Sequence, residues 1–531
     1  MSSVSRRAFL RHATALSGLG VAAPLGLSLS AMSQASAQSA TGDYKALVCL
    51  FMYGGNDAYN TVLRTDSEAW RHYTKHRNPA SRNTGDTSTS LALAALGTPV
   101  DPQAAPGTPA RLGGVRGINT SATGPVNNQS VALHPMLADV ANLHNAGRVA
   151  VLANVGPLIQ PLSKADYASP LVPRPVKLFS HNDQQSTWQS FSPEGADGGW
   201  GGRMGDLLMA RNGASLGALS SVAQESLTCI SPGAPAVWMT GQSTRALQVG
   251  SSDIPGLTQV ADLMGHSALQ SSLASVMSTG GSTLFAADHQ NVVRRAISTH
   301  ELLSGILPPL GTAEGLAWSS DGYTQPWGDP RLMYISPIDG QARHNPVAAQ
   351  LQMVARLLDA NRTGQLGMQR QVFMVSLSGF DSHSGQSTEH ADRMAQLNHA
   401  LSYFDTVLGN MPAGDMRSQV TTFTASDFGR SFTSNGDGTD HGWGGHHFIM
   451  GGAVQGGDVY GTLPQYASAD AQGVFDSPDL LDNGIMLPST SVDQYAYTLG
   501  RWMGVSNTDL LTILPNLANF NASTHDLGFM G

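Results

Sequence analysis

The sequence predicts an α/β fold in which helices cover both faces of a mostly parallel central sheet. Several short apolar segments end in glycine or in polar residues. Segments with apolar residues at three- and four-residue spacing lie between them, and strands that alternate with helices in this way are typical of α/β proteins. Hydrophobic residues make up 41% of the 531 residues and charged residues only 13%. This composition allows a large core and excludes a disordered chain.

Five segments are predicted as strands because each is a short apolar run rich in β-branched or aromatic residues. The runs are almost continuously apolar rather than alternating, which indicates burial on both faces, as in a parallel sheet. The predicted strands are residues 46–52, 149–155, 372–377, 420–424 and 448–450.

Helices are predicted between these strands from the spacing of their apolar residues. One further helix should begin at Ser180, a good N-cap residue with Asp183 at the third helical position. Residues 75–130 are rich in Gly, Ser, Thr, Pro and Asn and are predicted as long surface loops. The predicted helices are residues 135–144, 291–303, 347–358 and 391–408.

The N-terminus has the pattern of a twin-arginine export signal. Arg6 and Arg7 precede a weakly apolar stretch, and Ala35-Ser36-Ala37 is typical of a signal-peptidase site. Glycines and a proline break the apolar stretch, and no cysteine follows it for lipid attachment. We therefore expect a signal peptide at residues 1–37 and no stable membrane anchor. The twin-arginine translocase would carry the protein to the periplasm or out of the cell.

Residues 38–531 are expected to form one α/β domain. Within it, residues 205–345 are less periodic and are predicted to be an insertion or cap. The net charge of −9 argues against a nucleic-acid partner, since binding phosphates requires a basic face.

Polar residues with metal-binding chemistry follow three of the predicted strands. Asp57 follows the first strand, Asp381 and His383 follow residues 372–377, and Asp427 and Arg430 follow residues 420–424. Strands of a parallel sheet end at one edge, where ligands bind in such folds. Each residue has a simpler interpretation, such as turn formation at Asp57 or hydrogen bonding by His383.

The densest cluster is the glycine-rich segment 435–447, which contains His441. Carboxylate together with imidazole suits zinc, manganese or iron better than calcium, although a glycine-rich calcium loop remains an alternative. We expect one or two divalent ions, with zinc, manganese and calcium as the choices. His446 and His447 have the alternative of simply beginning the next strand.

Ser180 and His181 stand at the predicted helix start. A capping role for Ser180 is one interpretation. The other is a nucleophile, because a helix N-terminus stabilises an alkoxide or a bound oxyanion. The two roles are compatible.

Together these motifs resemble the exported domain-of-unknown-function family 1501, which is grouped with the alkaline phosphatase-like superfamily. That superfamily includes sulfatases, phosphodiesterases and metal-dependent phosphoglycerate mutases. The resemblance implies an alkaline phosphatase-like fold with Ser180 in the nucleophile's place. It implies a set of metal ligands comprising Asp57, Asp381, His383, Asp427 and His441.

Three features depart from the superfamily pattern. Phe428 stands where phosphatases have a metal-binding histidine, and His383 follows Asp381 at an unusually short spacing. The sequence contains no Cys-x-Pro-x-Arg segment, so the formylglycine chemistry of common sulfatases is not expected. These departures leave open whether one ion or two are bound, and whether the site is active.

The leading hypothesis is an exported metal-dependent hydrolase of phosphate or sulfate esters, acting on a small-molecule or glycan ester. Ser180 would attack, while His181 or Arg430 would steady the non-bridging oxygens or protonate the leaving group. One alternative is a non-catalytic exported module of the same fold that binds glycan or assists cell-surface assembly. A calcium-stabilised structural protein is the third hypothesis.

Overall fold

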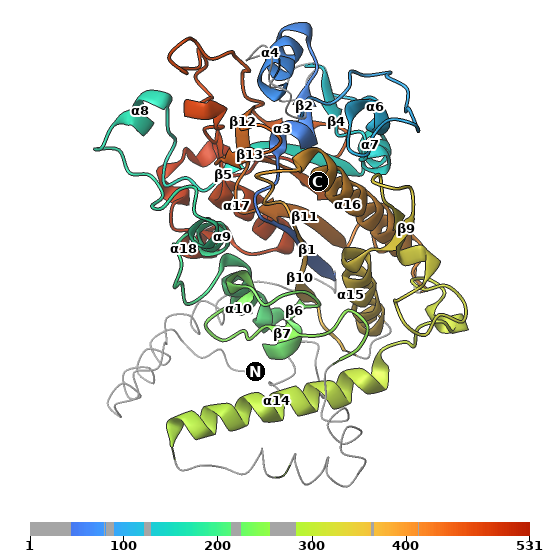
Figure 1. The fold of residues 1–531 in the computed structure, drawn as a ribbon. Helices are drawn as coiled ribbons and strands as arrows, with labels where there is room; N and C mark the ends of the chain where they lie inside the picture. The colour runs from blue at the N-terminus through green and yellow to red at the C-terminus, as the bar shows by residue number, and fades with distance from the viewer. Residues whose placement is uncertain are drawn as a thin grey trace. The chain divides into compact units, whose positions relative to one another are not determined.

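A nine-stranded mixed sheet lies at the centre of the computed structural model (Figure 1). The structure describes residues 44–78, 80, 90–121, 129–213, 225–254, 275, 283–362, 366–412 and 414–531. Residues 44–531 form one compact unit. The predicted signal peptide, residues 1–37, lies outside the described residues.

The sheet is mostly parallel, as predicted. From one edge its order is β15 (Val459–Gly461), β5 (Val149–Gly156), β14 (Gly445–Met450), β11 (Val420–Ser426), β1 (Lys45–Tyr53), β10 (Arg370–Ser378), β6 (Cys229–Ser231) and β7 (Leu247–Gln248), and β16 (Thr490–Ser491) also pairs with β5. Among these nine strands only β14 runs antiparallel to its neighbours, β11 and β5. The five predicted strands are all present.

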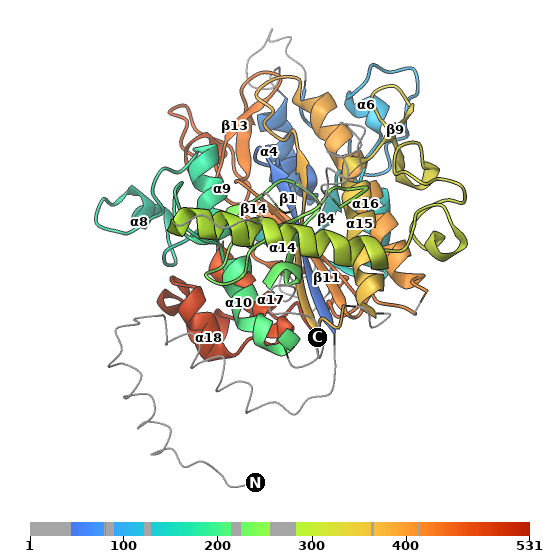
Figure 2. The ribbon, with the colours of Figure 1, turned by 90° about the horizontal axis from the view of Figure 1, so that it is seen from below.

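Helices cover both faces of the sheet. Ala46, Val48, Leu50 and Met52 of β1 pack with one group of helices, and Leu47, Cys49 and Phe51 pack with the other. Figures 1 and 2 show the two groups on opposite sides of the sheet. The first group comprises α7 (Ala138–Asn145), α15 (Pro346–Arg362) and α16 (Gln386–Gly409). The second group comprises α9 (His181–Ser190), α10 (Trp200–Gly213), α17 (Val492–Met503) and α18 (Asn507–Ile513).

The remaining elements are mostly short, apart from the 23-residue helix α14 (Leu284–Ile306). They are α3 (Ala58–Thr61), α4 (Ser67–Arg77), α6 (Pro109–Leu112), α8 (Lys164–Ala168), α14, the sheet of β2 (Val62–Arg64), β4 (Val131–Leu133) and β3 (Arg116–Ile118), and the pairs β12 (Arg430–Ser434) with β13 (Thr439–His441) and β8 (Met333–Ile335) with β9 (Ala342–His344). Among the helices of the described part, none is both long and apolar enough to cross a membrane.

The predicted helices are found with shifted boundaries. The helix predicted at 135–144 begins at Ala138, and the stretch 291–303 lies within the longer α14. The segment 205–345 was predicted to be an insertion, and two of its short strands, β6 and β7, extend the central sheet beyond β10. That segment therefore contributes to the sheet itself, and its role as a cap stays a prediction.

Candidate metal centre

Three loops leave the sheet together at the carboxyl ends of β1, β10 and β11. The register pairs Tyr53 with Ser378 and Met52 with Ser426, so the three strands end at nearly the same level. Gly54 has a φ of 113°, and a Cβ there would overlap the backbone nitrogen of Asp381. A glycine at this position therefore allows the loops after β1 and β10 to touch.

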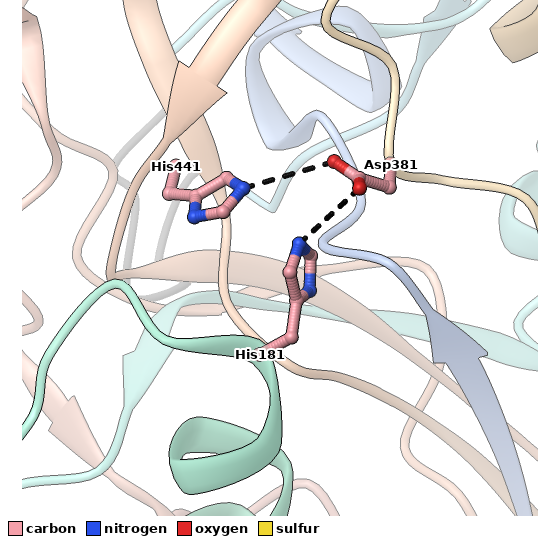
Figure 3. Close-up of side chains that lie close together, drawn as sticks. All are labelled: His181, Asp381 and His441. Carbon is pink, nitrogen blue, oxygen red and sulfur yellow. Dashed lines mark ion pairs between the residues drawn. The ribbon is translucent and has the colours of Figure 1, made fainter.

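His181, Asp381 and His441 converge where these loops meet (Figure 3). His181 Nε2 lies 3.5 Å from Asp381 Oδ2, and His441 Nε2 lies 3.7 Å from Asp381 Oδ1. One ligand atom from each residue lies within 4.8 Å of the other two. The group combines the first residue of α9, the loop after β10 and the end of β13, which are far apart in the sequence.

Both imidazoles of this group are held through Nδ1. His181 Nδ1 lies 2.8 Å from Asp427 Oδ2, and His441 Nδ1 lies 2.6 Å from the carbonyl oxygen of Phe179. A carbonyl acceptor requires a hydrogen on Nδ1 of His441, and a carboxylate favours the same tautomer in His181. Each ring then carries its lone pair on Nε2, the atom that can bind a cation, and His441 Nε2 lies 2.9 Å from His383 Nε2. His181 Nε2 is buried and has no hydrogen-bond partner in the described structure.

Asp427 is the anchor for His181. Its side chain is fully buried, and Oδ2 also accepts from Gly54 N at 3.2 Å and from Gln185 Nε2 at 2.8 Å. The hydrogen bond to Asp427 raises the pKa of His181 and outweighs the opposing effect of burial. Asp427 therefore orients the imidazole of His181 through Oδ2, while its buried Oδ1 has no hydrogen-bond partner in the described structure.

Arg430 is the anchor for Asp381. Its guanidinium is fully buried and donates from Nη2 to Asp381 Oδ1 at 2.7 Å and to the carbonyl of Phe380 at 3.0 Å. Burial raises the pKa of Asp381, but the hydrogen bond and charge of Arg430 outweigh it and leave the pKa lowered. Asp381 is thus ionised at neutral pH, and its side chain is 48% exposed, which also favours the charged form. Because Arg430 is buried, its contacts are with protein groups.

His383 lies on the exposed side of the group. Its Nε2 is 3.0 Å from Asp381 Oδ1 and 2.9 Å from His441 Nε2. Burial lowers the pKa of His441, and the neighbouring cationic groups add to this effect. The ring of Phe428 packs against His181 and His441, with centroid distances of 4.8 and 4.7 Å. Phe428 therefore supplies an apolar wall beside both imidazoles.

Asp57 lies apart from this group. Its carboxylate is fully buried and paired with the guanidinium of Arg77, with Arg77 Nη2 2.8 Å from Oδ1 and Nη1 in contact with Oδ2. Gln386 donates to Oδ2 and Tyr59 N donates to Oδ1. Burial raises the pKa of Asp57, but the charge and hydrogen bonds of Arg77 more than offset this and lower it. A guanidinium thus stands against both oxygens that were expected to bind a metal.

Ser180 occupies the N-cap position of α9, but its side chain accepts no hydrogen bond from the helix backbone. Its hydroxyl instead donates to Asp183 Oδ2 at 2.9 Å. Asp183 also pairs with Lys177 at 3.0 Å. The two non-glycine residues Lys177 and Phe179 have positive φ angles of 53° and 72° just before the helix. This rare backbone conformation turns the Phe179 carbonyl toward His441.

The structure brings together six of the eight residues named from the sequence, namely His181, Asp381, His383, Asp427, Arg430 and His441, and leaves Asp57 and Ser180 with other partners. Sequence reasoning missed Arg77 and Gln386, because nothing in their local pattern links them to Asp57. His446 and His447 lie in β14, in agreement with the alternative that they begin a strand, and burial lowers the pKa of each to about 3.

The donors of His181, Asp381 and His441 fit a divalent cation. Two imidazole nitrogens and one carboxylate oxygen suit zinc or manganese, and catalytic zinc sites use three protein ligands with one position left open. The unpartnered Nε2 of His181 and the restraint of both Nδ1 atoms are features of such ligands.

No curated protein matches the chain. Residues 332–514 match the model of a family described as "Protein of unknown function (DUF1501)". The matched part contains Asp381, Asp427 and His441 but not His181. This match supports the family resemblance inferred from the motifs and names no reaction.

Proposed function

We propose that this protein is an exported, metal-dependent hydrolase of phosphate or sulfate esters. The observation that supports this most directly is the convergence of two restrained imidazoles and an ionised carboxylate at the carboxyl edge of the sheet. In this proposal His181, Asp381 and His441 hold a divalent cation, zinc or manganese. When bound, the cation would offset the negative charge of the ester group.

Two residues named from the sequence take positioning roles in the proposal. Asp427 fixes the tautomer of His181, and Arg430 holds Asp381 in place while lowering its pKa. Asp57 is not included among the ligands, because Arg77 already neutralises it.

Ser180 is the proposed nucleophile, since it immediately precedes His181 and its hydroxyl already donates to a carboxylate. As the Ser180 oxygen bonds to the phosphorus or sulfur atom, its proton would pass to Asp183 Oδ2. His383, which is half-exposed beside the group, would give a proton to the leaving oxygen. Water would then release the phosphate or sulfate from Ser180.

Metal analysis and turnover of Asp381→Asn test this proposal. We expect wild-type protein to bind a stoichiometric divalent ion and to hydrolyse 4-nitrophenyl phosphate or sulfate. Asp381→Asn should lose the ion and at least about 100-fold of the activity. Asp415→Asn is the matched control, because Asp415 is 50% exposed and also pairs with an arginine, Arg417. Equal metal content and turnover in wild type and Asp381→Asn would refute the proposal. Metal binding without any turnover would instead favour a binding module.

A further inference from the structure

A polar cleft lies beside the candidate metal centre along one face of α9. Its volume is about 260 Å³. Four successive positions on one side of the helix line it, namely Asn182, Gln185, Ser186 and Gln189. The spacing of three and four residues places their side chains on the same face. Tyr53, at the end of β1, and the segments 194–196 and 235–237 complete the lining.

The cleft combines neutral hydrogen-bonding side chains with small or apolar ones. Five of its eleven lining residues carry an amide or a hydroxyl, and only Glu194 has a charged side chain. Asn182 and Glu194 are exposed, and neither side chain has a hydrogen bond within the described structure. Burial raises the pKa of Tyr53 to about 12, so its hydroxyl stays neutral. With no lysine or arginine in its lining, the cleft lacks the groups that bind phosphate or sulfate.

Gln185 joins this cleft to the candidate metal centre. It lines the cleft and donates from Nε2 to Asp427 Oδ2 at 2.8 Å. The same oxygen accepts from His181 Nδ1 at 2.8 Å. Asn182 follows His181 directly in α9. A molecule in the cleft would therefore lie next to the histidine end of this helix.

We infer that the cleft binds an uncharged, hydroxyl-rich part of the substrate, a monosaccharide ring, while the metal centre takes the ester group attached to it. This assignment of substrate class rests on the proposed hydrolase function. The Asn182 amide, which has no hydrogen bond in the described structure, can donate to one ring hydroxyl and accept from another, and Glu194 can accept from a hydroxyl pair. Sites built to hydrogen-bond hydroxyls discriminate strongly against ligands that lack them. Sugar esters should therefore be better substrates than aryl esters.

The first test compares kinetics of Asn182→Ala on two kinds of ester. With hexose 6-phosphate or 6-sulfate, the variant should raise KM about three- to tenfold, the loss of one hydrogen bond. With 4-nitrophenyl esters, KM should change less than twofold. Asn142→Ala is the control, since Asn142 is an exposed asparagine on a different helix, α7. Equal KM changes for both kinds of ester would overturn the inference and leave the proposed function standing.

The second test needs no turnover. Binding of methyl glucoside, methyl galactoside and methyl N-acetylglucosaminide to the full chain is measured by ligand-observed NMR, with and without zinc. We expect at least one glycoside to bind, and Asn182→Ala and Glu194→Gln to weaken it while Asn142→Ala does not. Binding without hydrolysis of any ester would support the cleft and count against the hydrolase. No binding of any glycoside, or equal binding by all variants, would overturn the inference.

Discussion

Asp57 and Asp381 follow neighbouring parallel strands, β1 and β10, yet the two carboxylates have opposite surroundings. Asp57 is fully buried against the guanidinium of Arg77. Asp381 is half-exposed and has the Nε2 atoms of three histidines within 3.7 Å of its oxygens. The charge of Asp57 is already balanced by an arginine of the same chain, so no bound metal ion is required there. Asp381 also pairs with a guanidinium, but Arg430 contacts only one of its oxygens, Oδ1, and the carboxylate stays half-exposed beside imidazoles that are neutral when unprotonated. It therefore has room and further ligand atoms for an ion.

Removal of the internal cation should have the largest effect. Arg77→Met keeps much of the apolar stem but leaves Asp57 buried without a counter-charge, so we expect a loss of about 3–5 kcal/mol in the free energy of unfolding. Arg343→Met is the control, because Arg343 and its partner Asp339 are both exposed and such pairs contribute about 1 kcal/mol or less. The measurement is denaturant unfolding.

A double variant separates charge from packing in this pair. Asp57→Asn added to Arg77→Met removes the uncompensated charge and should restore part of the lost stability. If the double variant is no more stable than Arg77→Met, the effect comes from lost packing and the contrast drawn above fails.

The fold was predictable where local pattern determines structure. The uninterrupted apolar runs that became β1 and β10 have few alternatives to a strand buried on both faces. The antiparallel direction of β14 was not predictable. It depends on how the segment after β13 returns to the sheet and pairs with both β11 and β5.

The site was predictable in its residue types and not in its partners. Asp381 and His441 were named as metal ligands because carboxylates and imidazoles near strand ends are suited to metal binding. His181 was named for a different role, steadying the oxygens of the ester or protonating the leaving group. The same reasoning as for Asp381 named Asp57 as a metal ligand, but in the structure Asp57 pairs with Arg77. That pairing depends on the docking of α4 above the sheet, a tertiary contact with no signal in the sequence around either residue.

A third carboxylate, Asp493, extends the comparison because it is buried and forms no ion pair with any described residue. Its oxygens accept from the backbone and side chain of Asn516 at 3.0 and 3.3 Å. Burial raises its pKa to about 7 from 3.8, opposite in direction to Asp57. The folded protein therefore binds a proton that the unfolded chain has released. This contribution to stability is fully present below about pH 4 and is lost as pH rises through 7.

Asp493→Asn should remove that pH dependence. Over this range the wild type should lose up to about 4 kcal/mol relative to the variant, at about 1.4 kcal/mol per pKa unit. Urea unfolding of both proteins at intervals between pH 4 and 8 gives the difference directly, because other titrating groups cancel. Parallel curves for the two proteins would show that Asp493 is ionised in the folded state.

Added zinc should change the free energy of unfolding less than the preceding variants do, and it should act only when Asp381 is present. A ligand that binds the folded state alone at 100 times its dissociation constant adds about 2.7 kcal/mol to the free energy of unfolding. We expect wild-type protein to gain an increment of this order, and Asp381→Asn to gain little. A chelator should reverse the gain. It should not affect the Arg77–Asp57 pair, because the cation there is an arginine side chain. An equal gain in wild type and Asp381→Asn would mean that zinc binds elsewhere and that Asp381, like Asp57, needs no ion.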